Sequence, residues 1–101
     1  MVERLQGVIA ARKGGDPAKS WSSKLLSDPP LASKKLAEEA LEAALAAVKG
    51  DAAELAAESA DLIYHWLVVL EIHGVTLDDV AAKLEAREGT SGVAEKAARK
   101  R

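Results

Sequence analysis

Five carboxylates in two short groups are the residues best suited to carry chemistry. Glu38, Glu39 and Glu42 lie in the stretch KKLAEEALEAAL, residues 34–45. At about 100° per residue on an α-helix, Glu42 falls between Glu38 and Glu39, so the three side chains share one narrow arc. Glu38 and Glu42 are also like charges one turn apart, which costs an isolated helix roughly a few tenths of a kcal/mol. Alanine would avoid that repulsion, so we expect the cluster to serve a function.

The second group, Glu58 and Asp61, follows a predicted turn at Gly50. Helices joined by a tight turn pack antiparallel, so residues equally far from the turn lie at the same height. Glu42 and Glu58 are each eight residues from the turn glycine, and Glu39 and Asp61 are each eleven. At about 1.5 Å per residue, these levels are roughly 12 Å and 16 Å from the turn. The two helices are therefore expected to present their acids at matching depths.

Acids that face one another across packed helices need a positive partner. Helix axes lie about 8–10 Å apart, a gap that carboxylates bridge through an ion but cannot fill with mutual hydrogen bonds. Without an ion, their repulsion is on the order of several kcal/mol at an intermediate dielectric. Oxygen ligands without His or Cys favour Mg²⁺ or Mn²⁺, and room for water and phosphate favours Mg²⁺ over a Ca²⁺ cage. The alternative is a solvated acidic face, since EExxE is common in alanine-rich helices. The predicted metal ligands are Glu38, Glu39, Glu42, Glu58 and Asp61.

The composition is that of one small globular domain. Of its 101 residues, 49% are hydrophobic and 30% are charged, which argues against a disordered chain. The lack of cysteine excludes disulfides, thiolate metal sites and a thiol nucleophile. The stretch MVERLQGVIAARK lacks the apolar centre of a signal peptide, and LIYHWLVVL is too short to span a bilayer. We therefore expect a cytoplasmic protein with no membrane contact.

The net charge of −2 conceals a strong partition along the chain. Residues 1–35 carry seven basic and three acidic side chains, whereas residues 36–61 carry one basic and seven acidic side chains. A basic segment followed by an acidic one suits a site that holds both phosphate and metal. The basic residues do not line a recognition helix and the chain is not positive overall, so nucleic-acid binding is not expected.

Apolar spacing predicts an all-α fold, because no stretch shows the alternation typical of strands. Gly50 and Gly74 are natural helix stops, and Pro29-Pro30 is expected to interrupt the chain. The predicted helices are 2–13, a short turn in SWSSKLL, Leu31 to Lys49, Asp51 to His73, and Thr76 to about Gly89. Capping boxes are predicted at Asp51 with Glu54 and at Thr76 with Asp79.

Two of these helices carry apolar surface that must be covered. The helix at 31–49 has a predicted core-facing stripe of Leu36, Ala40, Leu41, Ala44, Leu45 and Val48. The helix that follows is apolar all round from Leu62 onward and must be surrounded. We therefore predict a helical bundle built on the antiparallel hairpin and completed by homodimerisation, with the segment from Leu62 onward at the centre of the dimer. The domain is predicted to span residues 1–89, with a basic, flexible tail at 90–101.

The acidic motifs resemble those of a known superfamily. EExxE at 38–42 followed by ExxD at 58–61 is similar to the MazG-like, all-α nucleoside-triphosphate pyrophosphatases. The segments DPAKSWSSKLL, KKLAEEALEAALAA and ESADLIYHWLVVL resemble a narrower family, the phosphoribosyl-ATP pyrophosphatases of histidine biosynthesis. The resemblance implies hydrolysis of the α–β phosphoanhydride of phosphoribosyl-ATP with Mg²⁺, which yields phosphoribosyl-AMP and pyrophosphate.

This chemistry suggests roles for individual residues. One acid not fully engaged with metal could accept a proton from the attacking water, and we predict Glu39 for this role, with Glu38 as the alternative. The predicted substrate contacts are Lys24, Lys34 and Lys35 for phosphate, Trp21 for base stacking, and His65. Each lysine has the alternative of a solvated surface charge. Trp21 and His65 have the alternative of a plain packing role.

Two other functions stay open at this point. A housecleaning pyrophosphatase of the same superfamily would act on ordinary nucleotides such as dCTP or dUTP. A non-catalytic helical dimerisation module would need no metal. The sequence leaves open the number of metal ions, the identity of the base and whether two subunits share a site.

Overall fold

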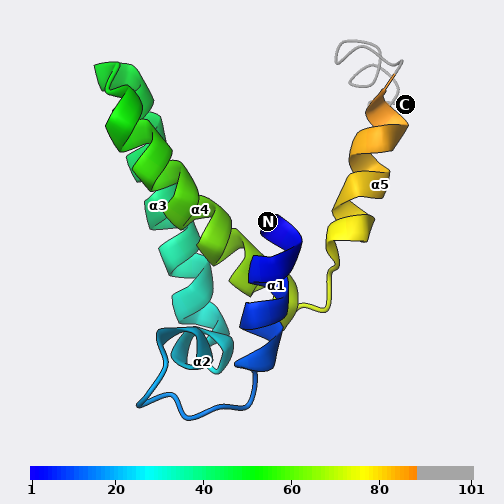
Figure 1. The fold of residues 1–101 in the computed structure, drawn as a ribbon. Helices are drawn as coiled ribbons and strands as arrows, with labels where there is room; N and C mark the ends of the chain where they lie inside the picture. Colours follow the sequence, from blue (N-terminus) through cyan, green and yellow to red (C-terminus); the bar gives the residue numbers. More distant parts are fainter. Residues whose placement is uncertain (89–101) are drawn as a thin grey trace.

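The computed structural model describes residues 1–88, and this part of the chain forms five α-helices and no β-strand. The helices are α1 (Val2–Ala11), α2 (Trp21–Leu26), α3 (Pro29–Lys49), α4 (Ala52–Ile72) and α5 (Leu77–Arg87). α3 and α4 form a long hairpin, α1 and α2 pack near its open end, and α5 stands apart (Figure 1). The predicted all-α class is confirmed. The predicted tail at 90–101 lies outside the described residues.

The hairpin forms because α3 ends and α4 begins within two residues. Gly50 ends α3 with φ at +74°, a left-handed conformation that glycine adopts without a Cβ penalty. Asp51 then caps α4, since its side chain accepts a hydrogen bond of 3.0 Å from the Glu54 N–H. The carboxylate of Glu54 pairs back across the turn with Lys49 at 3.2 Å. These local contacts keep the connection short and the helices antiparallel.

α3 begins earlier than predicted, and the prediction that Pro29-Pro30 would interrupt the chain was wrong. The two prolines occupy the first positions of the helix, and the Asp28 side chain caps it by accepting a hydrogen bond of 3.2 Å from the Leu31 N–H. Proline suits these positions because the first N–H groups of a helix have no intrahelical partner. The prolines therefore start α3 instead of breaking it.

The apolar core lies at the open end of the hairpin, away from the Gly50 turn. Its buried residues come from four helices and are Ile9, Leu25, Ala32, Leu67 and Val68. Between residues 37 and 61 the buried side chains are only Ala43 and Ala46, both on α3. Small side chains allow the two helices to approach closely in this part of the hairpin. The acidic groups lie in this same stretch.

The prediction that the apolar stripe of α3 faces the core of this chain was wrong. Of its six residues, Leu36 is half-buried. The other five are exposed, and they are Ala40, Leu41, Ala44, Leu45 and Val48. α3 turns Ala43 and Ala46 inward instead. Ala43 lies roughly 200° around the helix from Leu41, so the apolar stripe faces away from the chain's own core.

α5 begins with the capping box that its sequence predicts. The Thr76 hydroxyl accepts a hydrogen bond of 3.0 Å from the Asp79 N–H, and the Asp79 carboxylate accepts one of 2.9 Å from the Thr76 N–H. The chain bends by 108° between α4 and α5. No residue of α5 is buried. Within residues 1–88, no single helix has both the length and the apolar character needed to cross a bilayer.

Gly50→Ala is expected to destabilise the protein, whereas Gly7→Ala is expected to stabilise it. A Cβ at either position meets no atom within 4 Å, so neither change creates a clash. At Gly50 the positive φ penalises alanine by about 1–2 kcal/mol. At Gly7, inside α1, alanine gains about 0.5–1 kcal/mol from its helix propensity. Thermal unfolding followed by circular dichroism should show Tm shifts of opposite sign, and shifts of the same sign would contradict this description of the turn.

Candidate metal centre

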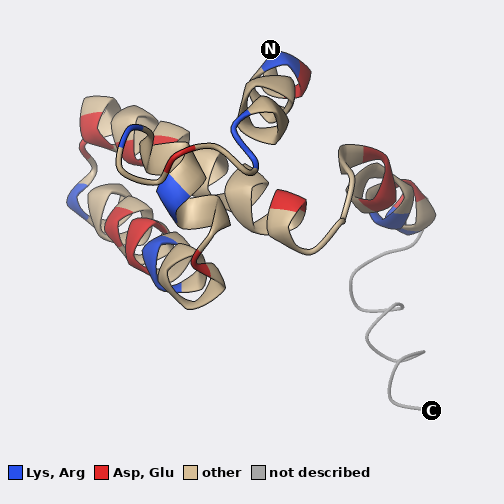
Figure 2. Cartoon of the chain, turned by 90° about the horizontal axis from the view of Figure 1, so that it is seen from below, with Lys and Arg blue, Asp and Glu red and all other residues tan. Residues whose placement is uncertain are grey.

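Carboxylates from α3 and α4 meet in the arm of the hairpin. One oxygen from each of Glu39, Glu58 and Asp61 lies within 4.8 Å of the other two. Within residues 1–88 this is the only such group of three potential metal ligands. Figure 2 shows acidic segments on both arms of the hairpin, with basic segments beside them on α3. The antiparallel register of the two helices therefore brings acids far apart in sequence to one place.

The remaining two predicted acids have different surroundings. Glu42 lies against Glu58, where it is the strongest influence on the pKa of that residue. Glu38 instead interacts within α3, since its carboxylate accepts a hydrogen bond of 3.3 Å from Lys35 and lies 4.0 Å from the Lys34 ammonium. The structure thus groups three of the five acids, places the fourth beside them and engages the fifth with lysines.

The proximity of these acids changes their protonation. Hydrogen bonding with Glu42 is the largest of the influences that raise the pKa of Glu58 to about 7, followed by burial and by the negative charge of Glu42. For Glu39, burial is the main reason that the pKa is raised, and the charges of Glu42 and Asp61 raise it further. A hydrogen bond between two carboxyl groups requires a proton on one of them. The fold therefore favours a partly protonated cluster.

Two carboxylate oxygens of these acids have no partner in the fold. Glu39 Oε2 and Glu58 Oε2 are both buried and have no hydrogen-bond partner among the described residues. Ionised carboxylates cannot donate to each other, and an unpartnered buried oxygen is unfavourable. A hard divalent cation would satisfy both oxygens and reduce the repulsion. The donor set, which contains oxygen alone, fits Mg²⁺ or Mn²⁺.

The predicted substrate residues of α2 and α3 lie at the surface or are already paired. Lys24 places its ammonium 5.7 Å from the centre of the Trp21 ring, and both residues are exposed on α2. Lys34 and Lys35 surround Glu38, as described above. Lys24 thus lies on α2, whereas Lys34 and Lys35 lie on α3, the helix that also carries Glu39.

His65 is buried in α4 and interacts with the segment that carries Asp61. Its Nδ1 lies 2.7 Å from the backbone carbonyl oxygen of Asp61. A carbonyl oxygen only accepts hydrogen bonds, so Nδ1 carries the proton in this contact. The ring of Tyr64 packs edge-on against the His65 ring, with centroids 5.0 Å apart and planes at 89°. These contacts orient the imidazole.

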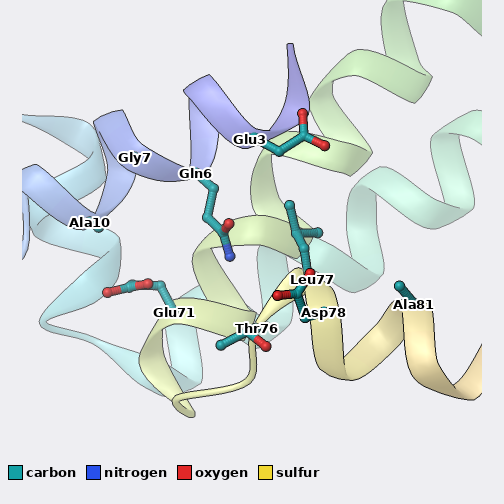
Figure 3. A pocket seen from close by; sticks show the side chains of 9 residues that line it. All are labelled: Glu3, Gln6, Gly7, Ala10, Glu71, Thr76, Leu77, Asp78 and Ala81. Carbon is teal, nitrogen blue, oxygen red and sulfur yellow. The ribbon is translucent and has the colours of Figure 1, made fainter.

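A cavity of about 630 Å³ lies outside the acidic cluster, between α1, the end of α4 and the start of α5 (Figure 3). Three of its lining residues are acidic, namely Glu3, Glu71 and Asp78. They do not form a group of potential metal ligands, because the only such group within residues 1–88 is the one on α3 and α4. The cavity and the candidate metal centre therefore lie at different places in this chain.

Sequence reasoning missed one contact near the site, the hydrogen bond between the hydroxyl groups of Ser22 and Tyr64. The two residues are 42 positions apart on different helices. Neither helical periodicity nor the register of the hairpin relates α2 to α4, so no spacing rule reveals this pair. The position of Tyr64 directly before His65 is the only local signal.

The raised pKa of Glu58 should make the stability of the metal-free protein fall as pH rises. The pKa of this group is about 7 in the fold against an ordinary value of 4.5, so the folded state binds its proton more tightly than the unfolded state does. Its contribution to stability is fully present below pH 4.5 and is lost as pH rises through about 7. Thermal unfolding in EDTA between about pH 5 and about pH 8 should show a larger decrease in Tm for wild type than for Glu58→Gln. Identical pH profiles would contradict the raised pKa.

Comparison with known proteins identifies the family of this chain. The model of a family described as "Phosphoribosyl-ATP pyrophosphohydrolase" matches residues 2–88. A protein named "Phosphoribosyl-ATP pyrophosphatase" from Caulobacter vibrioides (strain NA1000 / CB15N) is 62% identical over 99 residues, which cover 98% of this chain and 92% of the relative. Proteins of the same name from Cereibacter sphaeroides (strain ATCC 17029 / ATH 2.4.9) and Dinoroseobacter shibae (strain DSM 16493 / NCIMB 14021 / DFL 12) are 55% and 52% identical, with at least 97% of each chain covered. The chain therefore belongs to the phosphoribosyl-ATP pyrophosphohydrolase family.

Proposed function

We propose that this chain hydrolyses the α–β phosphoanhydride of phosphoribosyl-ATP, the second step of histidine biosynthesis, with Mg²⁺ held by acids of α3 and α4. The observation that carries the proposal is the group of Glu39, Glu58 and Asp61 in a chain of this family. The relatives that bear the name of this activity match nearly the whole chain. A cytoplasmic location is part of the same proposal.

Three carboxylates are the proposed metal ligands. Glu39 and Glu58 each offer a buried oxygen that lacks a partner. One oxygen from each of Glu39, Glu58 and Asp61 lies within 4.8 Å of the other two. Glu42, beside Glu58, is a fourth candidate. When bound, Mg²⁺ supplies positive charge against the triphosphate and lowers the pKa of water, and Mn²⁺ would serve in its place.

Proton transfer is assigned to Glu39. In hydrolysis, the water oxygen bonds to one phosphorus of the anhydride, the bridging P–O bond breaks, and the carboxylate accepts a proton from the water. Glu39 lies in the group of acids that would hold the metal, and its second carboxylate oxygen is left to accept the proton. Glu38 is less suited, because Lys34 and Lys35 already surround its carboxylate. We assign Glu38 the role of holding these two lysines near the acids.

The basic residues supply the proposed contacts to the remainder of the substrate. Lys34 and Lys35 can exchange the carboxylate of Glu38 for phosphate oxygens. Trp21, which is 44% exposed, presents a ring on which an adenine base can stack, and Lys24 lies over the same ring. His65 has a role in orienting the substrate or the α4 acids through its contact with Asp61.

A homodimer is also part of the proposal, because apolar surface is exposed on more than one helix. Leu41, Leu45 and Val48, here called the outer α3 ridge, are 61%, 50% and 84% exposed. Their i, i+4, i+7 spacing aligns them on one face. A second copy that packs against the ridge would remove this apolar surface from water.

Asp61→Asn and Glu58→Gln should each lower kcat/KM for phosphoribosyl-ATP by at least about 100-fold, because each removes a charged metal ligand at nearly constant shape. The matched control is Glu54→Gln on the same helix, whose carboxylate only pairs with Lys49 at the surface. Its activity should stay within about twofold of wild type. Pyrophosphate release is measured across a Mg²⁺ titration, with dCTP and dUTP as competing substrates. Full activity of Asp61→Asn, or a preference for the deoxynucleotides, would overturn the assignment.

Leu45→Glu and Val48→Glu should convert a dimer into a monomer, since each places a charge on the outer α3 ridge. Val8→Glu provides the matched control, because Val8 is 52% exposed on α1 and lies outside the ridge. Sedimentation velocity at micromolar concentration should give a dimer for wild type and Val8→Glu, and a monomer for the two ridge variants. A monomeric wild type would refute the proposed assembly.

A further inference from the structure

α2 is too short to be stable alone and depends on contacts made by its side chains. It has six residues, fewer than an isolated helix needs in water. Leu25 is fully buried in the core. The Ser23 hydroxyl donates a hydrogen bond of 2.8 Å to the Arg12 carbonyl oxygen. A Cβ at Gly15 would lie 2.7 Å from the same hydroxyl oxygen, so the loop before α2 packs tightly against it.

A second hydroxyl of α2 connects this helix to α4. The hydroxyl groups of Ser22 and Tyr64 are hydrogen-bonded in a half-buried position. Tyr64 follows Asp61 by one turn, and its ring packs edge-on against His65. His65 in turn bonds to the carbonyl oxygen of Asp61. A continuous series of contacts therefore runs from α2 to the segment of α4 that carries an acid of the cluster.

The outward face of α2 carries the two residues assigned to the substrate. Trp21 and Lys24 are exposed, whereas Leu25 and Ser23 are buried and Ser22 is half-buried. The orientation of α2 around its own axis therefore decides where the Trp21 ring and the Lys24 ammonium lie relative to the acids. Among the contacts of α2 that involve side-chain hydroxyls, that of Ser22 is the one that reaches α4.

We propose that Ser22 and Tyr64 are positioning residues for substrate binding, which hold the Trp21 and Lys24 face of α2 at a set place relative to the acids of α4. This inference rests on the proposed function, because it takes Trp21 and Lys24 as substrate contacts. Without the hydrogen bond, α2 keeps Leu25 in the core but its orientation is less restricted. Substrate binding must then restrict it, which weakens affinity. The acids themselves keep their surroundings.

The expected result is a change in KM with little change in kcat. Ser22→Ala and Tyr64→Phe should each raise KM for phosphoribosyl-ATP about three- to tenfold, which is the range for one neutral hydrogen bond. The double variant should show no further increase, since both changes remove the same contact. Ser22→Thr keeps the hydroxyl and should restore the KM of wild type. Affinity for Mn²⁺ should be unchanged in all of these variants.

Ser27→Ala is the matched control, because its hydroxyl bonds to the Lys24 carbonyl oxygen at the exposed end of the same helix. Its KM should equal that of wild type. Hydrogen exchange adds a readout without substrate, and amides of residues 21–26 should exchange faster in Tyr64→Phe. Unchanged KM and exchange in Tyr64→Phe, or additive effects in the double variant, would overturn the inference while leaving the proposed function intact. Lack of turnover by wild type would overturn both.

Discussion

Repulsion among carboxylates on two facing helices is the constraint on which this structure depends. Three acid oxygens within 4.8 Å of one another are unfavourable unless a proton or a cation lies among them. The pKa of Glu58 is raised to about 7, so below this pH a proton on Glu58 reduces the repulsion in the metal-free fold. A divalent cation would compete for the same oxygens, so metal binding and proton release are linked. The proposed Mg²⁺ would satisfy carboxylate oxygens that the chain itself leaves without a partner.

The fold separates this unfavourable cluster from the part that stabilises it. The buried apolar side chains of α1, α2 and α4 gather at the open end of the hairpin, whereas the arm that carries the acids buries only alanines of α3. Close approach of the helices in the arm sets the separation of the acids, and the core anchors α2 beside them. Stability and chemistry therefore depend on different segments of the same two long helices.

The hairpin and its register were predictable from the sequence, because they depend on local signals. Gly50 and Asp51 define the turn, and counting residues from it places Glu42 level with Glu58 and Glu39 level with Asp61. In the structure Glu42 is the strongest influence on the pKa of Glu58, and the charge of Asp61 raises the pKa of Glu39. The outer α3 ridge was not placed correctly, since periodicity identifies an apolar face but not the surface that covers it. The partners of Lys35 and Tyr64 depend on side-chain conformation and on tertiary packing, which no spacing rule contains.

The most direct test of this account is calorimetric titration of the metal-free protein with Mg²⁺ in buffers of different ionisation enthalpy. The account predicts saturable binding with release of protons, and the number released per ion should decrease as pH rises through about 7, where Glu58 loses its proton without metal. Glu58→Gln should bind more weakly and release fewer protons. Absence of saturable binding, or proton release that does not vary with pH, would contradict the claim that these acids are held together for a cation.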